Sequence, residues 1–465
     1  MKHKSKIFIL LPDGVGLRIF AYSEFYKTAK INDLDLVYWN NTPFNLTNLG
    51  FDEIKIQNSR NHFFTEIFKN TRKHIELNLS IKRENDNVYD SYRFPFPFKS
   101  LKAIIKSLIT KFLIVTHSSE KGLFKIKQKI NDLERKTDFY KQSFATLQKE
   151  KPNLVFCTNQ RSSSAIAPIL AAQDLSIPTA SFIFSWDNLP KATMVTETDF
   201  YFVWSDLMKK ELLNYYPYVK ENQIFVTGTP QFDNHFDKDI LLSKTVFFNQ
   251  YNLDLNKDYI CFSGDDETTS PDDEKYLDDF ANAIVNLNKK GHKLGIIFRK
   301  CPVDFSGRYE KIIEKYKTVI VEIAPKWDAI GTDWNTILPT KEDNFLLSNT
   351  IEHSLFVVNI GSSMVFDFVS FNKPCCYFNY NQETKKIKNW DIYKCYKYVH
   401  FRSMPNKDAV VWFNAATEIE NNIESLLLES ESTVVNAKKW FETINQHPPE
   451  KASERICNAI KTILK

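Results

Sequence analysis

Short apolar runs recur along the chain, separated by stretches whose apolar residues repeat at helical spacing. Runs of this length, rich in Val, Ile, Phe and Tyr, are typical of buried strands. The first series consists of KIFILL (6–11), DLVYW (35–39), NLVFCT (153–158), TASFIF (179–184), FYFVW (200–204) and IFVTG (224–228). Helical patterns lie between them at 17–30, 162–174 and 205–215. This half therefore predicts strands that alternate with helices.

A second series of apolar runs follows the same rhythm. Its strands are YICFSG (259–264), LGIIFR (294–299), TVIVEI (318–323), LFVVNI (355–360) and CCYFNY (375–380). Its helical stretches are 272–289, 307–316, 343–353 and 363–371. Alternation of this kind favours parallel sheets built from right-handed crossovers. The fold class that we predict is α/β, with two Rossmann-like doubly wound domains facing a cleft.

The chain has 465 residues, which exceeds one ordinary hydrophobic core. We assign residues 1–228 to an N-terminal domain with a helical insertion at about 57–148. Residues 229–416 form a second domain, and 417–465 are expected to be helices that pack back on the first domain.

The insertion contains an amphipathic segment. RFPFPF (93–98) cannot be regular helix, because proline removes a donor and restrains its neighbour. The helical pattern KSLKAIIKSLITKFL (99–113) then places Leu, Ile and Phe on one face, and residues 98–128 hold seven lysines and one acid. One interpretation is a core-packed helix with a solvated face. The other is that 98–114 contacts an anionic membrane surface or docks an acceptor.

Composition and charge narrow the class of protein. Hydrophobic residues make up 43% and charged residues 25%, as in soluble globular proteins. The net charge of +4 argues against nucleic acid as a partner. Seven scattered cysteines without a CxxC pair indicate reduced thiols. We expect a cytoplasmic protein, peripheral at most to the inner face of a membrane.

The clearest candidate for chemistry is Gly361-Ser362-Ser363, between a strand-like run and a helical pattern. Amides in the first turn of a helix lack internal partners and carry partial positive charge, so with two hydroxyls they suit phosphate oxygens. Asp367 follows one turn later, within reach of a sugar hydroxyl beyond the phosphate. The alternative is that a serine is only a helix N-cap.

Two more strand ends carry charged residues. Arg299 and Lys300 end the run IIFR, where positive charge could stabilise a diphosphate leaving group. Glu267 lies after YICFSG and is a candidate donor contact. Asp265 and Asp266 come nearest to a metal-binding pair, but their acid-rich run favours a solvated loop, so we expect no metal and no other cofactor.

The first domain should hold the acceptor. Asp13, Gly14 and Gly16 directly follow the first predicted strand, on the side where ligands bind parallel sheets. Transfer with inversion needs a base for the acceptor hydroxyl, and Asp13 is our first candidate, Asp187 the second. Either could instead be a turn or helix cap.

Four segments in order resemble the donor half of GT-B glycosyltransferases and, more closely, the CDP-glycerol glycerophosphotransferases of wall-polymer synthesis. They are the Gly-Ser-Ser-x-x-x-Asp-Phe segment with its later Lys-Pro, VTGTPQFD (226–233) with Gly228, IIFRKCP (296–302), and LLSNTIEHSLFVVN (346–359). The resemblance covers about 180–380. It implies that Ser362 and Ser363 face nucleotide phosphates and that Asp367 lies near the ribose or sugar.

One feature of the glycerophosphotransferases is missing. They carry a His-Gly that supplies a base, and this chain has none. The corresponding FSWDNLPKA (184–192) resembles the Ser-Trp-Asp-Asn of surface-polysaccharide glycosyltransferases and adds Trp186 and Asn188 as acceptor contacts. The resemblance therefore favours bacterial sugar transfer from a nucleotide-sugar to a glycan or lipid-linked acceptor. A nucleotide-sugar epimerase, a glycerophosphotransferase and a non-catalytic binding protein remain alternatives.

Overall fold

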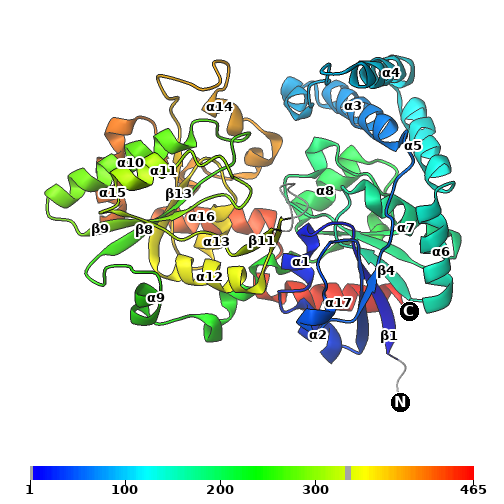
Figure 1. Cartoon of the computed structure of the whole chain (residues 1–465), viewed down its shortest axis with the longest axis horizontal. Helices are drawn as coiled ribbons and strands as arrows, with labels where there is room; N and C mark the ends of the chain where they lie inside the picture. Colours follow the sequence, from blue (N-terminus) through cyan, green and yellow to red (C-terminus); the bar gives the residue numbers. More distant parts are fainter. Residues whose placement is uncertain (1–3, 330–336) are drawn as a thin grey trace. The chain divides into compact units, whose positions relative to one another are not determined.

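The chain divides into two compact units in a computed structural model that describes residues 4–329 and 337–465 (Figure 1). Unit 1 consists of Met1–Pro230 together with Ile444–Lys465, and unit 2 is Gln231–Thr443. Each unit contains its own parallel sheet with helices on its faces. The C-terminal segment 417–465 is shared: its part up to Thr443 belongs to unit 2, and the rest belongs to unit 1.

The sheet of unit 1 has seven strands in the order β3-β2-β1-β4-β5-β6-β7. Their bounds are β1 Ser5–Leu11, β2 Leu34–Asn40, β3 Glu53–Lys55, β4 Leu154–Cys157, β5 Thr179–Phe182, β6 Phe200–Val203 and β7 Ile224–Val226. All neighbouring strands are parallel. The direction in which strands are added reverses between β1 and β4, so a topological switch point lies there.

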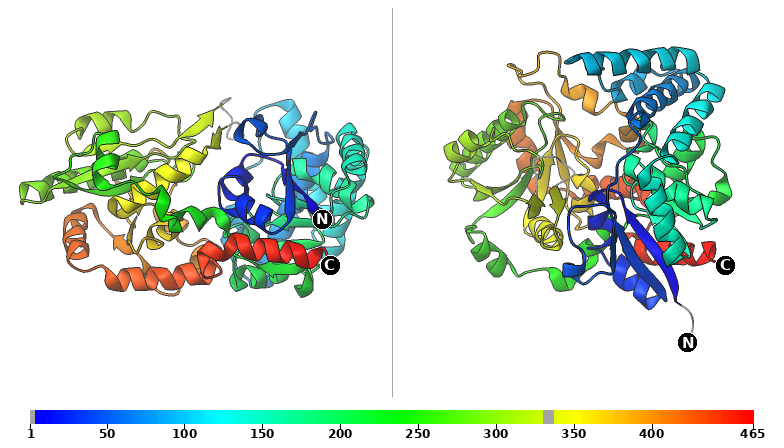
Figure 2. Two further views of the ribbon diagram at one scale, coloured as in Figure 1. Left: turned by 90° about the horizontal axis from the view of Figure 1, so that it is seen from below. Right: turned by 45° about the vertical axis from the view of Figure 1, so that its right-hand side comes forward.

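The predicted helix 17–30 is two helices, α1 (Val15–Phe20) and α2 (Phe25–Ile31). The break forms at Ser23, whose hydroxyl donates to the Ile19 carbonyl and accepts from the Phe25 N–H. Further helices of unit 1 are α7 Ile166–Asp174, α8 Asp206–Tyr215 and α17 Ala452–Ile463. The last of these packs against α2, as the left view of Figure 2 shows.

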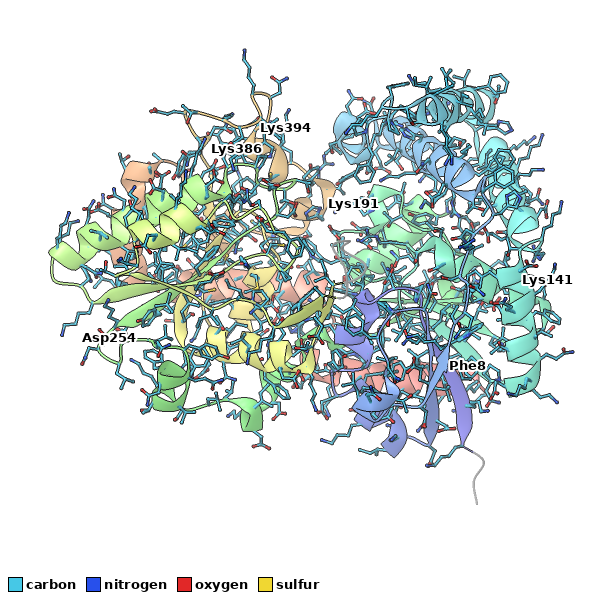
Figure 3. All side chains as sticks on the ribbon, in the orientation of Figure 1. Phe8, Lys141, Lys191, Asp254, Lys386 and Lys394 are labelled. Carbon is cyan, nitrogen blue, oxygen red and sulfur yellow. The ribbon has the colours of Figure 1, made fainter. Side chains whose placement is uncertain are left out.

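The predicted insertion is helical. It contains α3 Thr65–Glu84, α4 Leu101–His117, α5 Glu120–Glu134 and α6 Asp138–Glu150. Side chains of Ser100, Ser119 and Thr137 cap the last three at their N-termini. Both α4 and α5 pack on α3, and α6 packs on α7. In Figure 3, Lys141 projects outward from α6, whereas Phe8 lies in the core on β1.

The main sheet of unit 2 repeats the topology, in the order β10-β9-β8-β13-β14-β15 with all neighbours parallel. Its strands are β8 Asp258–Ser263, β9 Leu294–Arg299, β10 Ile320–Glu322, β13 Ser354–Asn359, β14 Cys375–Phe378 and β15 Val411–Phe413. A separate antiparallel pair is formed by β11 Trp327–Ala329 and β12 Ile337–Pro339. Here the switch point lies between β8 and β13.

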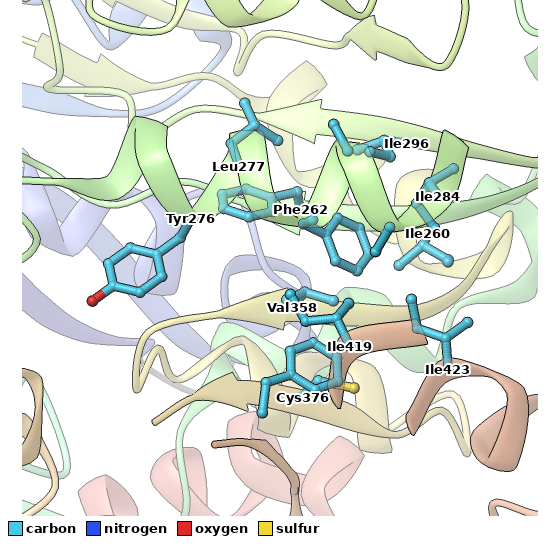
Figure 4. Packing of buried hydrophobic residues seen from close by; sticks show 14 of the residues in the cluster. Ile260, Phe262, Tyr276, Leu277, Ile284, Ile296, Val358, Cys376, Ile419 and Ile423 are labelled. Atoms are coloured by element: carbon cyan, nitrogen blue, oxygen red, sulfur yellow. The ribbon is translucent and has the colours of Figure 1, made fainter. Parts of the chain in front are cut away.

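Helices of unit 2 cover its sheet. They are α9 Lys244–Gln250, α10 Asp273–Lys289, α11 Glu310–Lys315, α12 Lys341–Glu352, α13 Met364–Val369, α14 Ile392–Cys395, α15 Ile419–Leu428 and α16 Glu431–Ile444. Figure 4 shows the core, in which Leu277 and Ile284 of α10 pack with Phe262 of β8 and with Ile423 of α15. The apolar stripe of α10 therefore fixes the carboxyl end of β8 in place.

Candidate functional site

Three sequence-derived candidates of unit 2 lie at the carboxyl ends of adjacent strands, at or next to its switch point. The loop after β8 holds Glu267, the turn after β13 holds Gly361-Ser362-Ser363, and Arg299 ends β9, the neighbour of β8. The Gly264 N–H donates to the Arg299 carbonyl at 2.9 Å, which ties the ends of β8 and β9 together. Ligands of doubly wound sheets bind at this point, outside the carboxyl ends of the strands.

The turn at Gly361 is held rigidly while its serines stay accessible. Gly361 has φ +64°, a backbone conformation that glycine adopts without strain. The Ser362 N–H donates to the buried Asn359 Oδ1 at 2.9 Å, and the Tyr377 hydroxyl donates to the Ser362 carbonyl at 2.8 Å. Ser363 is the N-cap residue of α13, its side chain makes no capping bond, and it is exposed. The simple N-cap alternative therefore does not account for Ser363, whereas the Ser362 hydroxyl does accept from the Met364 N–H, at 3.4 Å.

The Arg299 guanidinium is buried, and only one of its two terminal nitrogens has a hydrogen-bond partner among the described residues. Its Nη2 donates to both carboxylate oxygens of Asp343, at 2.9 and 2.8 Å, and Arg299 is 8% exposed. Its Nη1 is buried with no hydrogen-bond partner among the described residues. Burial opposes ionisation of Asp343, but the charge and hydrogen bonds of Arg299, with the Lys326 N–H and the Trp327 Nε1–H, hold the pKa of Asp343 below its usual value. Arg299 thus keeps one buried donor that no described residue engages.

The other two charged candidates lie toward the surface. Lys300 is 3.6 Å from Glu322 and 40% exposed, so this pair contributes little to stability. Glu267 is exposed in a turn that Asp266 caps through the Thr268 N–H at 2.8 Å. Among the described residues, no group of three or more His, Cys, Asp or Glu is arranged to hold a metal ion.

Asp367 lies in the interior, against a histidine. Its Oδ1 is 2.8 Å from Nε2 of His235, whose Nδ1 is 3.0 Å from the Ser348 hydroxyl. All three residues are buried. The chain of contacts joins α13 and α12 to the 3-10 segment Pro230–Phe236. Asp367 thus has a protein partner that the sequence did not predict, and it positions α13.

The candidates Asp13 and Asn188 of unit 1 lie in the loops after β1 and β5. The strand between these two in the sheet is β4. Asp13 follows β1, and its Oδ2 accepts from Nδ2 of Asn159, which follows β4, at 2.8 Å. Its Oδ1 accepts from the Val15 N–H at 3.2 Å. Burial raises the pKa of Asp13, although these hydrogen bonds and the Arg161 charge act against that rise. The carboxylate thus sits at the switch point with increased basicity.

The two glycines after β1 serve the turn into α1. Gly14 is its N-cap residue, with φ −75°. Gly16 allows close packing, because a Cβ there would lie 2.3 Å from the Thr158 Oγ1. Thr158 itself donates to the Leu10 carbonyl at 3.0 Å. Gly16 therefore has a packing role that brings α1 onto the end of β4.

The loop after β5 is polar and tightly bonded. Asp187 accepts from the Ser185 hydroxyl at 2.7 Å and from Asn188 Nδ2 at 2.9 Å, and it forms an ion pair with Lys191. Asn188 is buried and accepts from Gln160 at 3.1 Å. Trp186 is 8% exposed. The hydrogen bond between Gln160 and Asn188 connects the loop after β4 with the loop after β5.

An unpredicted carboxyl group, Glu211 of α8, lies near Asp187. Its Oε2 is buried without a hydrogen-bond partner among the described residues. Burial, followed by repulsion from Asp187, raises the pKa of Glu211 to about 8. Glu211 occupies a helical position that no strand-end motif marks, which explains why the sequence did not point to it.

Gly228 lies apart from the switch point. It follows β7, at the opposite end of the unit 1 sheet from β3, with φ +76°. A Cβ there would be 3.0 Å from Arg455 Nη2, and the Thr229 N–H donates to Asn445 Oδ1 at 3.0 Å. The glycine lets residues 445–455 cross this point.

Sequence reasoning missed Asn159, Gln160, Asn359 and Asp343. Asn159 and Gln160 directly follow the apolar run NLVFCT, and Asn359 lies near the end of the run LFVVNI. Polar amides at the ends of predicted strands are a signal that could have found these three. Asp343 carries no such mark, because its pairing with Arg299 joins residues 44 positions apart.

No protein-family model matches this sequence, and no curated protein does either. Solved structures do match. S. aureus MnaA with UDP aligns at a TM-score of 0.52 and 13% identity, over 99% of this chain and 97% of that one. The UDP-GlcNAc 2-epimerase from Methanocaldococcus jannaschii gives 0.53 and 14%, over 98% and 99%. A glycosyltransferase from Rickettsia africae ESF-5 gives 0.52 and 12%, over 99% of each chain. These likenesses and the two parallel sheets show that the chain has a GT-B-type fold.

Proposed function

We propose that this protein is a metal-independent glycosyltransferase. It would move a sugar from a nucleotide-sugar donor, bound by unit 2, to a surface-glycan or lipid-linked acceptor, bound by unit 1. The observation that carries the proposal is the Gly361-Ser362-Ser363 turn at the switch point of the unit 2 sheet, in which Ser363 is exposed and Ser362 is half-buried. Proteins of this fold named for UDP or UDP-GlcNAc support a nucleotide-sugar as the donor.

Three groups of unit 2 suit a diphosphate. The accessible hydroxyls of Ser362 and Ser363 can donate to phosphate oxygens, and the first turn of α13 contributes amides and partial positive charge. The Nη1 of Arg299 has no hydrogen-bond partner among the described residues, and we assign it as a charged donor to a phosphate; because this nitrogen is buried, the contact requires a local rearrangement of the strand end. These groups stabilise negative charge on the departing nucleotide without a metal.

Unit 1 offers a base for the acceptor. Asp13 has a raised pKa, which makes its carboxylate a better proton acceptor for a sugar or lipid-linked hydroxyl. Asp187 is the second candidate, but its charge is already balanced by Lys191. We therefore assign the proton transfer to Asp13, with Asn159 orienting it.

The donor assignment is tested by the heat stability of the protein with UDP, GDP, CDP and CMP. A nucleotide at 100 times its Kd adds about 2.7 kcal/mol of stability. Ser363→Ala and Arg299→Lys should each reduce the shift in Tm that the best nucleotide produces. Ser425→Ala, on the exposed surface of α15, is the matched control and should leave that shift unchanged. No shift with any nucleotide or nucleotide-sugar would refute the proposal.

Turnover separates the alternatives. An epimerase, whose fold is shared, would isomerise the sugar or release nucleotide with no acceptor present. A glycerophosphotransferase would consume CDP-glycerol, and a binding protein would shift in Tm without turnover. The proposed transferase consumes donor in proportion to acceptor, and Asp13→Asn should slow this by about 100-fold or more. Acceptor-independent isomerisation would replace our proposal with the epimerase function.

A further inference from the structure

Helix α4 of the insertion presents its apolar face to solvent. Leu101 is 74% exposed, Leu108 56%, Phe112 67% and Val115 80%. Together with Ile105, these residues lie within about 80° of the helix circumference, given 3.6 residues per turn. In Figures 1 and 2, α4 is the outermost helix of the insertion. We call these five residues the α4 stripe.

The inner side of the same helix is packed against unit 1. Ser107 and Thr110 are its buried residues, and they lie opposite the α4 stripe. The Ser107 hydroxyl donates to the Pro97 carbonyl of the preceding segment at 2.9 Å, and the Thr110 hydroxyl donates within the helix to the Lys106 carbonyl at 2.8 Å. Half-buried Leu113 packs on the apolar cluster that includes Ile75 of α3 and Leu123 of α5. The stripe therefore faces outward because the other side of α4 is the side that is packed.

Phenylalanines of the proline-rich segment before α4 are exposed as well. Phe94 is 77% exposed and Phe98 is 51% exposed, and the Lys111 ammonium of α4 lies 5.1 Å from the Phe98 ring centroid. Soluble proteins rarely leave so many large apolar side chains exposed along one helix, so the α4 stripe indicates an interaction site.

The charges around the stripe specify what covers it. Residues 98–117 contain four lysines and no acid. Lys102 and Lys111 are exposed on opposite flanks of the stripe, and Lys99 and Lys106 are also exposed. An apolar face with basic flanks suits the boundary between anionic lipid headgroups and acyl chains. A second copy of this chain would bring the same lysines against each other, which disfavours self-association.

We propose that α4 docks unit 1 on an anionic lipid bilayer, lying in the membrane surface with its stripe among the acyl chains. At 17 residues the helix is about 25 Å long. Among the described residues there is no helix long and apolar enough to cross a membrane, so α4 lies along the bilayer. This inference stands on α4 alone and is independent of the proposed transferase activity.

The test is co-sedimentation of the full-length protein with vesicles. Wild type should pellet with vesicles of equal parts phosphatidylethanolamine and phosphatidylglycerol, and far less with phosphatidylcholine vesicles. Leu108→Glu/Phe112→Glu should lower the partition coefficient by at least about tenfold, the factor that losing one buried Leu or Phe implies. Lys102→Gln/Lys106→Gln should lower it about fivefold per lysine on the anionic vesicles alone.

The matched control is Val246→Glu/Leu428→Glu, which changes two exposed apolar residues of α9 and α15 in the same way. It should pellet like wild type. The Leu108/Phe112 variant should keep the wild-type Tm, because both side chains face outward, and should keep any nucleotide-induced shift in Tm. Equal pelleting of that variant and wild type would overturn the proposal, as would absence of wild-type pelleting. A wild-type dimer that the variant dissociates, with no vesicle binding, would assign the stripe to self-association instead.

Discussion

The two units share one topology but differ in the chemistry at their switch points. Unit 1 places carboxylates and amides there, with Asp13 bonded to Asn159 across the reversal of strand order. Unit 2 places hydroxyls and a guanidinium there, on the Ser362-Ser363 turn and on Arg299. In our proposal the first set accepts a proton and the second donates to an anion. One topology can thus present different chemistry, because the residues at the strand ends differ between the units.

The units also differ in which polar groups are buried. In unit 2 the buried charges of Arg299 and Asp343 are paired, while Ser363 stays exposed. In unit 1 a carboxyl oxygen of Glu211 is buried without a hydrogen-bond partner among the described residues, and one of Asp265 in unit 2 shares that state. Substitutions at these positions therefore have different expected effects in the two units.

The largest effect is expected for Asp343→Ala. This change leaves the Arg299 charge buried and unpaired, so unit 2 should lose about 3 to 5 kcal/mol of stability. Urea denaturation followed by fluorescence measures it. Glu322→Ala is the control, because its ion pair with Lys300 is exposed and is worth about 1 kcal/mol or less. Equal, small losses in both variants would remove the distinction between buried and exposed pairs in unit 2.

Glu211→Gln should change how the stability of unit 1 depends on pH. The folded-state pKa of about 8 lies above the ordinary glutamate value of 4.5, so between these values the folded state holds a proton that the unfolded state has released. The free energy of unfolding of wild type therefore falls as pH rises through this window. Between pH 5 and pH 8.5 the free energy of unfolding of the glutamine variant should rise relative to that of wild type by about 2 to 4 kcal/mol.

Denaturation of the two proteins across that pH range tests this expectation. Asp187→Asn removes the second cause of the raised pKa and should reduce the pH dependence without abolishing it. Parallel curves for wild type and Glu211→Gln would mean that Glu211 is already ionised in the folded state.

Gly16→Ala should destabilise unit 1 by about 1 to 3 kcal/mol, the usual cost of overpacking. Its Cβ would lie 2.3 Å from the Thr158 Oγ1, and Thr158 is fully buried, so the strand end or α1 must shift. Thermal denaturation gives the loss. If Gly16→Ala kept the stability of wild type, α1 would have to move freely relative to β4. That result would weaken the case for a rigid switch point in unit 1.

Ser363→Ala should have the smallest effect on stability, below about 0.5 kcal/mol, because the side chain is exposed and makes no capping bond. Its effect should appear only in the nucleotide-induced shift in Tm. A loss of stability without nucleotide would instead indicate that Ser363 is a structural cap, and the contrast with unit 1 would then rest on Arg299 alone.

The sequence predicted the strands of both sheets well where they are long and buried. Runs such as 6–11 and 294–299 correspond to β1 and β9, since continuous apolar runs of this length form buried parallel strands. It missed β3 and β15, each of three residues. Strands this short at the edge of a sheet are stabilised by pairing with the adjacent strand, which their own pattern does not reveal.

The candidate site was likewise predictable from the sequence only in part. The position of Ser362-Ser363 after a predicted strand was readable from the sequence, because strand ends in a parallel sheet meet at one edge. The partners of the charged candidates were not, since Arg299–Asp343 and Asp367–His235 join residues 44 and 132 positions apart. Whether Asp367 faces a ligand or the interior is decided only when α12, α13 and Pro230–Phe236 pack together.

By itself, the sequence determined two series of parallel strands, their order along the chain and the chemistry at their ends, because periodicity and turn residues act locally. Only the tertiary structure decided which face of each helix is covered. The pattern of 99–113 shows that α4 is amphipathic, but most of its large apolar residues face outward while Ser107 and Thr110 are buried. Packing contacts between distant segments decide that direction, and no local pattern contains them.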